Sequence, residues 1–440
     1  MIGATERFFK DRRVSLAQAF LINAALGSGY SYGVFRPALE KHWSLNAADS
    51  GLPYMLFLAV FAFSMPLGGA LIERIGEKKT IWLGAVLLGA GWVLAGSAAD
   101  INSLSLCYGL IGGAGVGLAY GAPLSLAAKL YPDRKGAAMG AALAGFGLSP
   151  LFSAPLIRAA IDLAGPVKAF SYTGAVLAGA IALFSLFLRR PPAHPHAHTA
   201  PGLAALPPRD SSPAEMLRAG KFYSLWLCFA AACAIGLAVI GITPSFAAEV
   251  PGLGPAAGTA LLMAFSVFNA LGRPVFGWLA DRLGPAAAGA LSFALVSASA
   301  AALREFPGSC AVFIATFAVL WLNLGAWLAV APAATAHFFG LAHHPRNYGI
   351  VYTAYGAGAI AGVTLTSRLK DLTGGYAAAL GPIAAAALAF SAFSFFALKA
   401  ETAGRARGRC HKSRGAAPRE QDRPGPGAGA KSGAAGGGGR

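Results

Sequence analysis

Charged residues are scarce in this chain: 12% of its 440 residues are Asp, Glu, Lys or Arg, whereas 56% are apolar. A soluble domain usually carries about one-quarter charged residues, because water must solvate its surface. Acids are the scarcer sign, with 18 Asp and Glu against 35 Lys and Arg. The deficit excludes an ordinary water-soluble globular protein and indicates a chain whose main solvent is lipid.

Signatures of catalysis and of metal binding are missing from the sequence as well. We find no His-Glu-x-x-His, no Gly-x-Ser-x-Gly and no paired metal ligands. The five cysteines lack paired metal spacing and four lie in or beside apolar runs, so we expect no disulfide framework. The alternating His194, His196 and His198 fall in a Pro- and Ala-rich stretch that is typical of a solvated linker. We therefore predict that the protein is not an enzyme and uses no cofactor or metal.

What the sequence has instead is a series of long apolar runs. A helix needs about 20 predominantly apolar residues to cross the hydrocarbon core of a membrane. Twelve runs qualify, near residues 15–35, 52–72, 80–99, 104–127, 136–156, 169–188, 222–247, 257–279, 286–303, 311–336, 348–366 and 377–398. Their length fits helices better than the short alternating strands of an outer-membrane barrel. We predict an all-α membrane protein with twelve transmembrane helices.

The distribution of positive charge predicts the orientation, because Lys and Arg near helix ends stay on the cytoplasmic side. With the N-terminus inside, the cytoplasmic segments before the tail hold 17 of the 35 Lys and Arg residues, and the external loops hold seven. We predict a multi-pass protein of the cell (inner) membrane with both termini in the cytoplasm. The net charge of +17 is then explained by this topology and by anionic lipid, and we expect no binding of nucleic acid.

The two halves of the chain repeat each other. Residues 69–76 after the second span match residues 277–284 after the eighth at an offset of 208, and Pro123 matches Pro332 at an offset of 209. Two homologous halves predict a substrate site between them, near the membrane midplane. The predicted parts are a cytoplasmic N-terminus (1–14), an N-terminal six-helix bundle (15–188), a cytoplasmic linker (189–221), a C-terminal six-helix bundle (222–398) and a disordered basic tail (399–440).

The duplicated pattern Gly-x-Leu-x-acid-Arg-x-Gly resembles the signature of the major facilitator superfamily. The resemblance implies the major facilitator fold, with two pseudo-symmetric six-helix bundles. In that superfamily the acid and the arginine belong to a cytoplasmic clasp that holds the outward-open state. The corresponding residues here are Gly69, Glu73, Arg74, Gly277, Asp281 and Arg282. The basic residues that follow the first copy are absent after the second, so we expect the second clasp to be weaker.

Further stretches resemble the oxalate/formate antiporter family, which is related to the monocarboxylate transporters. They follow the family's order: Tyr30–Phe35, Ala128–Pro132, Lys221–Trp226, Asn269–Arg273, Asn347–Gly349 and Tyr352–Gly356. The resemblance implies a carrier of a small organic anion, a carboxylate, across the lipid bilayer. We expect the carrier to be a monomer.

Arg273 is the only charged residue inside the twelve runs and is the main site prediction. A charge at the centre of a span costs about 2.5–3.5 kcal/mol on insertion scales unless it faces a cavity or a partner. The equivalent residue of the first half is Met65, so the packing of the repeat does not require a cation. A guanidinium offers two parallel donors that match a carboxylate, so we predict that Arg273 binds the anion. Snorkelling to the interface or a structural pairing is the alternative.

Two neighbours of this arginine refine the prediction. Asn269 lies one turn earlier and is expected to share the anion or to hold Arg273, and a helix–helix hydrogen bond is an equal alternative. In the oxalate/formate antiporters, an arginine in the eighth span and a lysine in the eleventh form the dicarboxylate site. The resemblance assigns Arg273 to the first role, but Tyr355 stands in place of the lysine. A dianion such as oxalate would lose one ion pair here, whereas a monocarboxylate such as formate or lactate would not need it.

Aromatic and amide groups at helical spacing supply the remaining candidates. They are Asn23, Gly27 and Tyr30 in the first span, Tyr120 in the fourth, and Asn323 and Trp327 in the tenth. Family members line their cavity with aromatic residues, and the resemblance extends this role to Tyr30, Tyr120 and Trp327. Ordinary helix packing, or an aromatic side chain at the membrane interface, is the alternative for each. The glycines at 109, 113, 117 and 121 recur every fourth residue and predict the close approach of another helix.

The coupling mechanism is less defined by the sequence. No Asp or Glu lies inside a predicted span, which removes the usual carboxylate relay of proton-driven carriers. Exchange of one anion for another, or facilitated flow, is therefore favoured. A proton-linked monocarboxylate symporter is the first alternative, with the substrate carboxyl or His337 carrying the proton. A drug exporter, for which a buried acid is expected, and a transporter-like nutrient sensor are the others.

Overall fold

The computed structural model describes residues 12–131, 135–188, 210–253, 255–340 and 343–399. Throughout these residues the regular structure is helical. The first-half elements are α2 (Arg12–Leu26), η1 (Gly27–Ser31), α3 (Tyr32–Trp43), α4 (Ala47–Ile75), α5 (Glu77–Ala95), α6 (Ile101–Leu104), the π-helix η2 (Ser105–Gly112), α7 (Gly113–Ala119), α8 (Gly121–Leu130), α9 (Lys135–Ala164) and α10 (Lys168–Leu186). The second-half elements are α11 (Pro213–Leu217), α12 (Gly220–Ala247), α13 (Pro255–Glu305), α14 (Cys310–Phe339), α15 (His344–Val351), α16 (Thr353–Thr373), η3 (Tyr376–Ala379) and α17 (Leu380–Ala397).

The prediction of an all-α membrane fold is confirmed, and most of each of the twelve predicted runs lies in helical structure. Ten stretches of the described chain are long and apolar enough to cross a membrane. One of them, Ala257–Glu305, contains two predicted spans that meet at Gly284. The first predicted span is assembled from α2, η1 and α3 in succession. The linker histidines and the basic tail lie outside the described residues.

Backbone geometry repeats between the halves. Gly76 (φ 83°, ψ 163°) and Gly284 (φ 82°, ψ 159°) adopt the same conformation 208 residues apart, and residues with a Cβ rarely adopt it. Four of the five other positive-φ positions pair in the same way, Ser44 with Gly252 at an offset of 208 and Gly165 with Gly374 at 209, and Gly340 is the exception among the described residues. The repeat seen in the sequence is therefore also a repeat of turn geometry.

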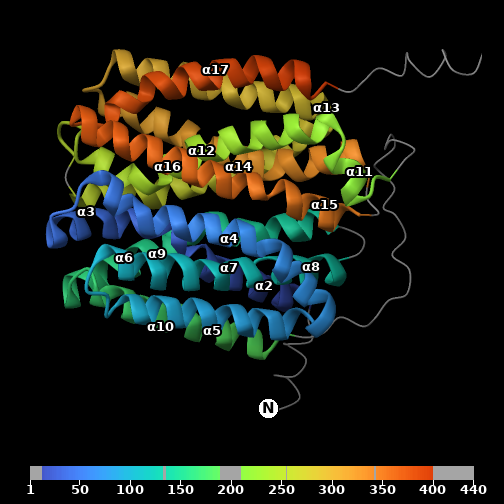
Figure 1. Cartoon of the computed structure of the whole chain (residues 1–440), viewed down its shortest axis with the longest axis horizontal. Helices are drawn as coiled ribbons and strands as arrows, with labels where there is room; N and C mark the ends of the chain where they lie inside the picture. The colour runs from blue at the N-terminus through green and yellow to red at the C-terminus, as the bar shows by residue number, and fades with distance from the viewer. Residues whose placement is uncertain (1–11, 132–134, 189–209, 254, 341–342, 400–440) are drawn as a thin grey trace, which may run out of the picture. The chain divides into compact units, whose positions relative to one another are not determined.

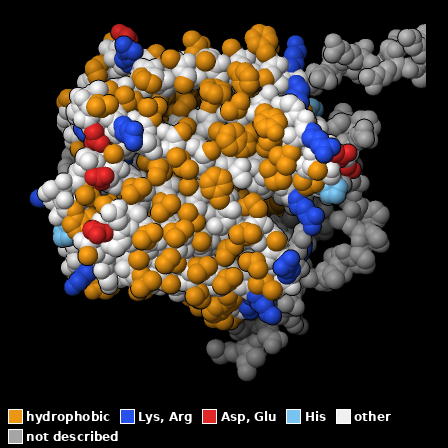
Figure 2. Space-filling view, viewed as in Figure 1, with side chains coloured by type: hydrophobic (Ala, Val, Ile, Leu, Met, Phe, Trp, Pro, Cys, Tyr) orange, Lys and Arg blue, Asp and Glu red, His pale blue; other side chains and the backbone are white. Residues whose placement is uncertain are grey.

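Apolar side chains cover the middle of the described surface, and charged side chains gather towards the two ends of the helices (Figure 2). Large exposed apolar side chains include Leu67, Val86, Leu106, Leu291 and Phe396. Soluble proteins rarely expose such a continuous apolar surface, whereas a bilayer solvates it. The helices of both halves run side by side (Figure 1), with α4 packed on α16 and α9 packed on α13.

The glycine prediction for the fourth span is confirmed, because these residues pack on α4. A Cβ at Gly113 would lie 2.6 Å from the carbonyl oxygen of Phe57, and one at Gly117 would lie 2.5 Å from that of Phe61. Larger side chains would therefore force α4 away from the fourth span. This close packing fixes the position of Phe61.

The predicted end of the first span at residue 35 is wrong, because the helix continues through α3 to Trp43. Arg36 therefore lies in the helix that continues the first predicted span, and it is 1% exposed. Glu40, one turn further on, accepts a hydrogen bond from its Nε at 3.1 Å. Beyond Glu40 the helix becomes exposed at Lys41 and His42, so the burial of charge in α3 is confined to Arg36.

Candidate functional site

Six aromatic side chains from both halves meet in the interior of the helix assembly, and we name them the central aromatic cluster. Each is at most 3% exposed. They come from η1, α4, the α7–α8 junction, α9, the α15–α16 junction and α16. The members are Tyr30, Phe61, Tyr120, Phe146, Tyr352 and Tyr355.

Phe61 contacts most of this cluster. Its ring centroid lies 5.2 Å from that of Tyr120, 5.7 Å from Phe146 and 5.5 Å from Tyr355. Tyr352 stacks on Tyr355 at 5.1 Å and lies 5.9 Å from Tyr120. Edge-to-face and offset-stacked rings contribute about 0.5–1.5 kcal/mol per pair beyond burial. The cluster therefore holds α4 and the fourth span of the first half against α16 of the second.

Two of the predicted tyrosines bond each other directly. The Tyr355 hydroxyl donates to the Tyr30 hydroxyl at 2.9 Å, which links α16 to η1. The Tyr30 ring also packs edge-on against Phe146 at 5.1 Å. The structure thus brings Tyr30, Tyr120 and Tyr355 together in one buried cluster that both halves build.

Arg273 lies on α13 beside the cluster and is 6% exposed. Its Nη1 donates to the Leu143 carbonyl oxygen on α9 of the first half, and its Nη2 lies 3.4 Å from Asn269 Oδ1. Its Nε has no hydrogen-bond partner among the described residues. Leu143 lies on α9 one turn before Phe146 of the cluster. Arg273 is therefore buried between the halves with an unused donor at Nε.

Asn269 holds Arg273 and also makes a helix–helix hydrogen bond, and its contact with an anion stays a prediction. Its Oδ1 accepts from Arg273, and its Nδ2 donates to the Trp321 carbonyl oxygen of α14 at 3.3 Å. A Cβ at Gly147 would lie 3.0 Å from the same Oδ1, so α9 approaches closely at this point. Asn269 thereby fixes one side of the Arg273 guanidinium relative to the second-half helices.

The repeat relates the residues of this region to one another. Phe146 and Tyr355 are equivalent at an offset of 209, and both belong to the central aromatic cluster. Phe61 is the equivalent of Asn269 at an offset of 208. Sequence reasoning missed Phe61, Phe146 and Tyr352. Projecting Tyr355 and Asn269 through the repeat would have found the first two.

Asn23 contributes to the packing of α9. Its Nδ2 donates to the Ala142 carbonyl oxygen at 3.0 Å, one residue before the carbonyl that accepts from Arg273. Two successive carbonyls of α9 therefore accept side-chain hydrogen bonds, one from each half of the protein. Gly27, on the same helix face, also lies close to α9, because a Cβ there would be 2.6 Å from the Phe146 carbonyl oxygen.

The two candidates from the tenth span point away from the cluster. Asn323 accepts from the Ser292 hydroxyl at 2.6 Å. The Trp327 ring packs against Phe293 at 5.2 Å. Both partners lie in the second part of α13, so these side chains fasten α14 within the second half. The structure does not bring them to Arg273.

The six predicted clasp residues lie at the end of α4 and in the middle of α13: Gly69, Glu73, Arg74, Gly277, Asp281 and Arg282. The Glu73 side chain lies outside the described part of the structure. Arg74 and Asp281 are exposed, and the Arg282 guanidinium lies 4.6 Å from the centre of the Trp278 ring. The clasp stays a prediction, and it concerns the outward-open state.

Comparison with a family model matches residues 19–362 to the Major Facilitator Superfamily. The oxalate:formate antiporter of Oxalobacter formigenes is 28% identical over 401 residues, which cover 89% of this chain and 93% of that protein. Monocarboxylate transporter 11 of Homo sapiens is 32% identical over 281 residues, covering 61% of this chain and 56% of the transporter.

A solved structure shares the fold. It is a bacterial homologue of the human lysosomal transporter Spinster, in an inward-facing and unoccupied conformation. The TM-score is 0.62 at 17% sequence identity, and the match covers 88% of this chain and 97% of that one. At this identity the likeness concerns the arrangement of helices alone.

Proposed function

Because the chain belongs to the Major Facilitator Superfamily, we propose that it carries small carboxylate anions across the membrane by alternating access, exchanging one anion for another. Transport rather than catalysis follows from the family. The multi-pass membrane location follows from the family match and from the apolar helices. The class of cargo and the exchange mode do not follow from the family and are our proposal.

Arg273 is the observation that supports the cargo class. A buried guanidinium with one unused donor is costly unless an anion reaches it. A carboxylate can accept from Nε and from Nη2, which now lies 3.4 Å from Asn269 Oδ1, in the bidentate geometry that arginine favours. The surrounding aromatic rings exclude water and strengthen this ion pair.

The functions of two relatives support the same cargo class. One is an oxalate:formate antiporter and the other a monocarboxylate transporter. In this chain the eleventh span supplies the Tyr355 hydroxyl at the cluster, which is already bonded to Tyr30. A single cation with neutral hydroxyls balances one negative charge, so we propose monocarboxylates as the preferred cargo.

Counterflow into proteoliposomes tests this function. Vesicles loaded with formate, lactate or oxalate are given labelled external anion, for the wild type, Arg273→Gln, Arg273→Lys and Arg158→Gln. Arg158 is an exposed arginine paired with Asp162 at 3.2 Å, so its removal controls for loss of a positive charge. We expect Arg273→Gln to abolish uptake, Arg273→Lys to keep part of it, and the control to match the wild type.

Two outcomes would contradict the proposal. Full carboxylate exchange by Arg273→Gln would remove the anchor. Uptake that needs an inward pH gradient but no internal anion would replace exchange with proton-linked symport. We further propose that the carrier is a monomer of the cell (inner) membrane with both termini in the cytoplasm, since most Lys and Arg residues before the tail then lie inside.

A further inference from the structure

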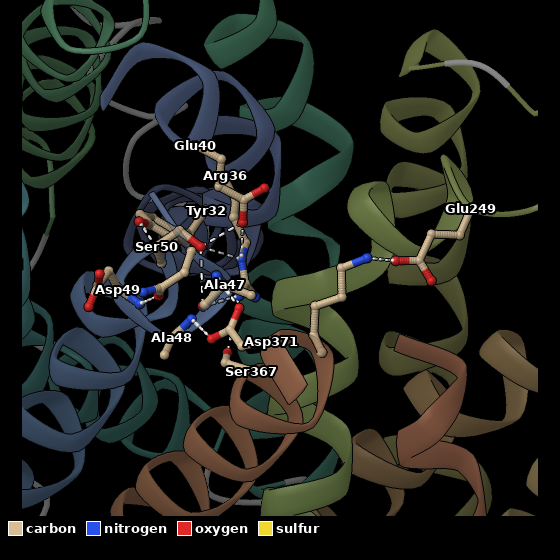
Figure 3. A network of polar contacts seen from close by, with 12 residues as sticks. Tyr32, Arg36, Glu40, Ala47, Ala48, Asp49, Ser50, Glu249, Ser367 and Asp371 are labelled. Atoms are coloured by element: carbon tan, nitrogen blue, oxygen red, sulfur yellow. Dashed lines mark hydrogen bonds and ion pairs between the residues drawn. The ribbon is translucent and has the colours of Figure 1, made fainter. Parts of the chain in front are cut away.

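A carboxylate from the second half caps a helix of the first half at the predicted external end, where α3 ends and α4 begins (Figure 3). Asp371, near the end of α16, accepts from the backbone N–H of Ala47 at 2.7 Å and from that of Ala48 at 2.9 Å. These are the first two residues of α4, whose N–H groups have no partner within the helix. The negative charge also matches the positive end of the α4 dipole.

Arg36 makes a second set of bonds across the same boundary (Figure 3). Its Nη2 donates to the Ser367 hydroxyl of α16 at 3.1 Å and to the Ala47 carbonyl oxygen. Its Nε donates to Ser50 Oγ at 3.0 Å, and its guanidinium lies 5.5 Å from the centre of the Tyr376 ring of the second half. One buried cation thus bonds α4 and α16 together.

The backbones approach closely beneath these bonds. A Cβ at Gly51 would lie 2.9 Å from Ser367 Oγ and 3.2 Å from Val363 Cγ1. One turn deeper, the Thr364 hydroxyl donates to Met55 Sδ at 3.1 Å. The described side chains of α4 and α16 are therefore in direct contact at this level, which closes the boundary between them to a solute.

The repeat shows that this arrangement is not required by packing. Asp371 and Ser367 are equivalent, at an offset of 209, to Asp162 and Arg158 on α9. Those two residues bond each other at 3.2 Å, and their side chains are about half exposed. The equivalent acid therefore stays within the first half, whereas Asp371 reaches across.

We propose that Asp371 and Arg36 are transport residues that latch the two halves together at the predicted external end. The latch consists of Asp371, Ser367, Arg36 and the first turn of α4. It closes the pathway at this end, and it must break before solute can enter or leave there. The inference depends on alternating access and not on the proposed carboxylate cargo, because its bonds are made between protein groups.

Hydrogen exchange with mass spectrometry, on the full chain in lipid nanodiscs without added solute, tests the latch. We compare the wild type with Asp371→Asn and with Asp162→Asn, which removes the equivalent acid from the other half. In Asp371→Asn we expect faster exchange both in the first turn of α4 and in the peptide that carries Val363–Ser367, by about tenfold for one lost charge-assisted bond. Asp162→Asn is expected to exchange as the wild type does.

A second variant opens the same boundary by a different route. Gly51→Val places methyl groups against Ser367 and should accelerate exchange in the same two peptides while leaving the Asp371 carboxylate in place. Faster exchange confined to Ala47–Ser50 in Asp371→Asn would show a local helix cap and overturn the latch. Equal exchange in Asp371→Asn, Gly51→Val and the control would overturn it as well.

Discussion

The Tyr355 hydroxyl donates a hydrogen bond to the Tyr30 hydroxyl and joins the eleventh span to the first inside the central aromatic cluster. The two residues are 325 positions apart in the chain. Their bond exists only while the halves are close together at this depth. The pair therefore reports on the contact between the two halves.

Removing one hydroxyl of this pair is expected to destabilise the protein slightly. Tyr355→Phe leaves the buried Tyr30 hydroxyl without its donor, at a cost of about 1 kcal/mol. We expect a lower Tm by scanning fluorimetry in detergent. The double variant Tyr30→Phe/Tyr355→Phe removes both groups and should recover part of the loss. A Tm loss in the double variant equal to the sum of the two single-variant losses would show that the two hydroxyls do not interact in solution.

Replacing Tyr355 by a cation is expected to change the preferred cargo. Tyr355→Lys places an ammonium group in the cluster, where it can pair with a second carboxylate while Arg273 binds the first. We expect counterflow of oxalate to increase relative to formate. The measurement is the ratio of the two initial rates, compared with Tyr355→Phe as a control for loss of the hydroxyl. An unchanged ratio would place Tyr355 outside the cargo site.

The fold was predictable because long apolar runs and a repeated motif can be recognised in the sequence without any knowledge of tertiary contacts. The twelve runs required only length and composition, and the offset of 208 required only matching of residues 69–76 with 277–284. The end of the first span was not predictable in this way. Arg36 is polar by type, and its burial depends on Ser367, which lies 331 residues away.

The candidate site was predictable only in part, because the partners of a side chain also depend on tertiary contacts. Arg273 stood out because it is charged in an apolar run, and its burial with an unused Nε agrees with that reasoning. Asn323 and Trp327 were chosen by helical spacing, which does not say which neighbour a helix face meets. They turn towards α13 because Ser292 and Phe293 supply partners there.

His344 is expected to make stability depend on pH. It lies before the eleventh span, and its burial lowers the pKa of the imidazole although Nε2 lies 3.1 Å from the Pro332 carbonyl oxygen. The folded protein therefore favours neutral His344, and its contribution is complete above the ordinary histidine pKa of about 6.5. It declines as the pH falls, because the unfolded chain takes up the proton more readily.

The measurement for His344 is the fall in Tm from pH 7.5 to pH 5.5. We expect a smaller fall in His344→Gln than in the wild type. His343→Gln alters the exposed neighbouring histidine and should behave as the wild type does. Equal falls in all three proteins would show that His344 titrates alike in the folded and unfolded chains.

Gly76 and Gly284 should be equally intolerant of a side chain, because the repeat gives them the same backbone conformation. A Cβ there is strained by its own backbone, at about 1–3 kcal/mol, although no other described atoms lie within 4 Å of the Cβ position at Gly284. Gly76→Ala and Gly284→Ala are therefore expected to lower the Tm by similar amounts. Gly179→Ala, in α10 and also with open space around it, should leave the Tm unchanged or raise it, since alanine favours helix. A lower Tm in only one of the two variants would show that the same backbone conformation does not carry the same energetic cost at both turns.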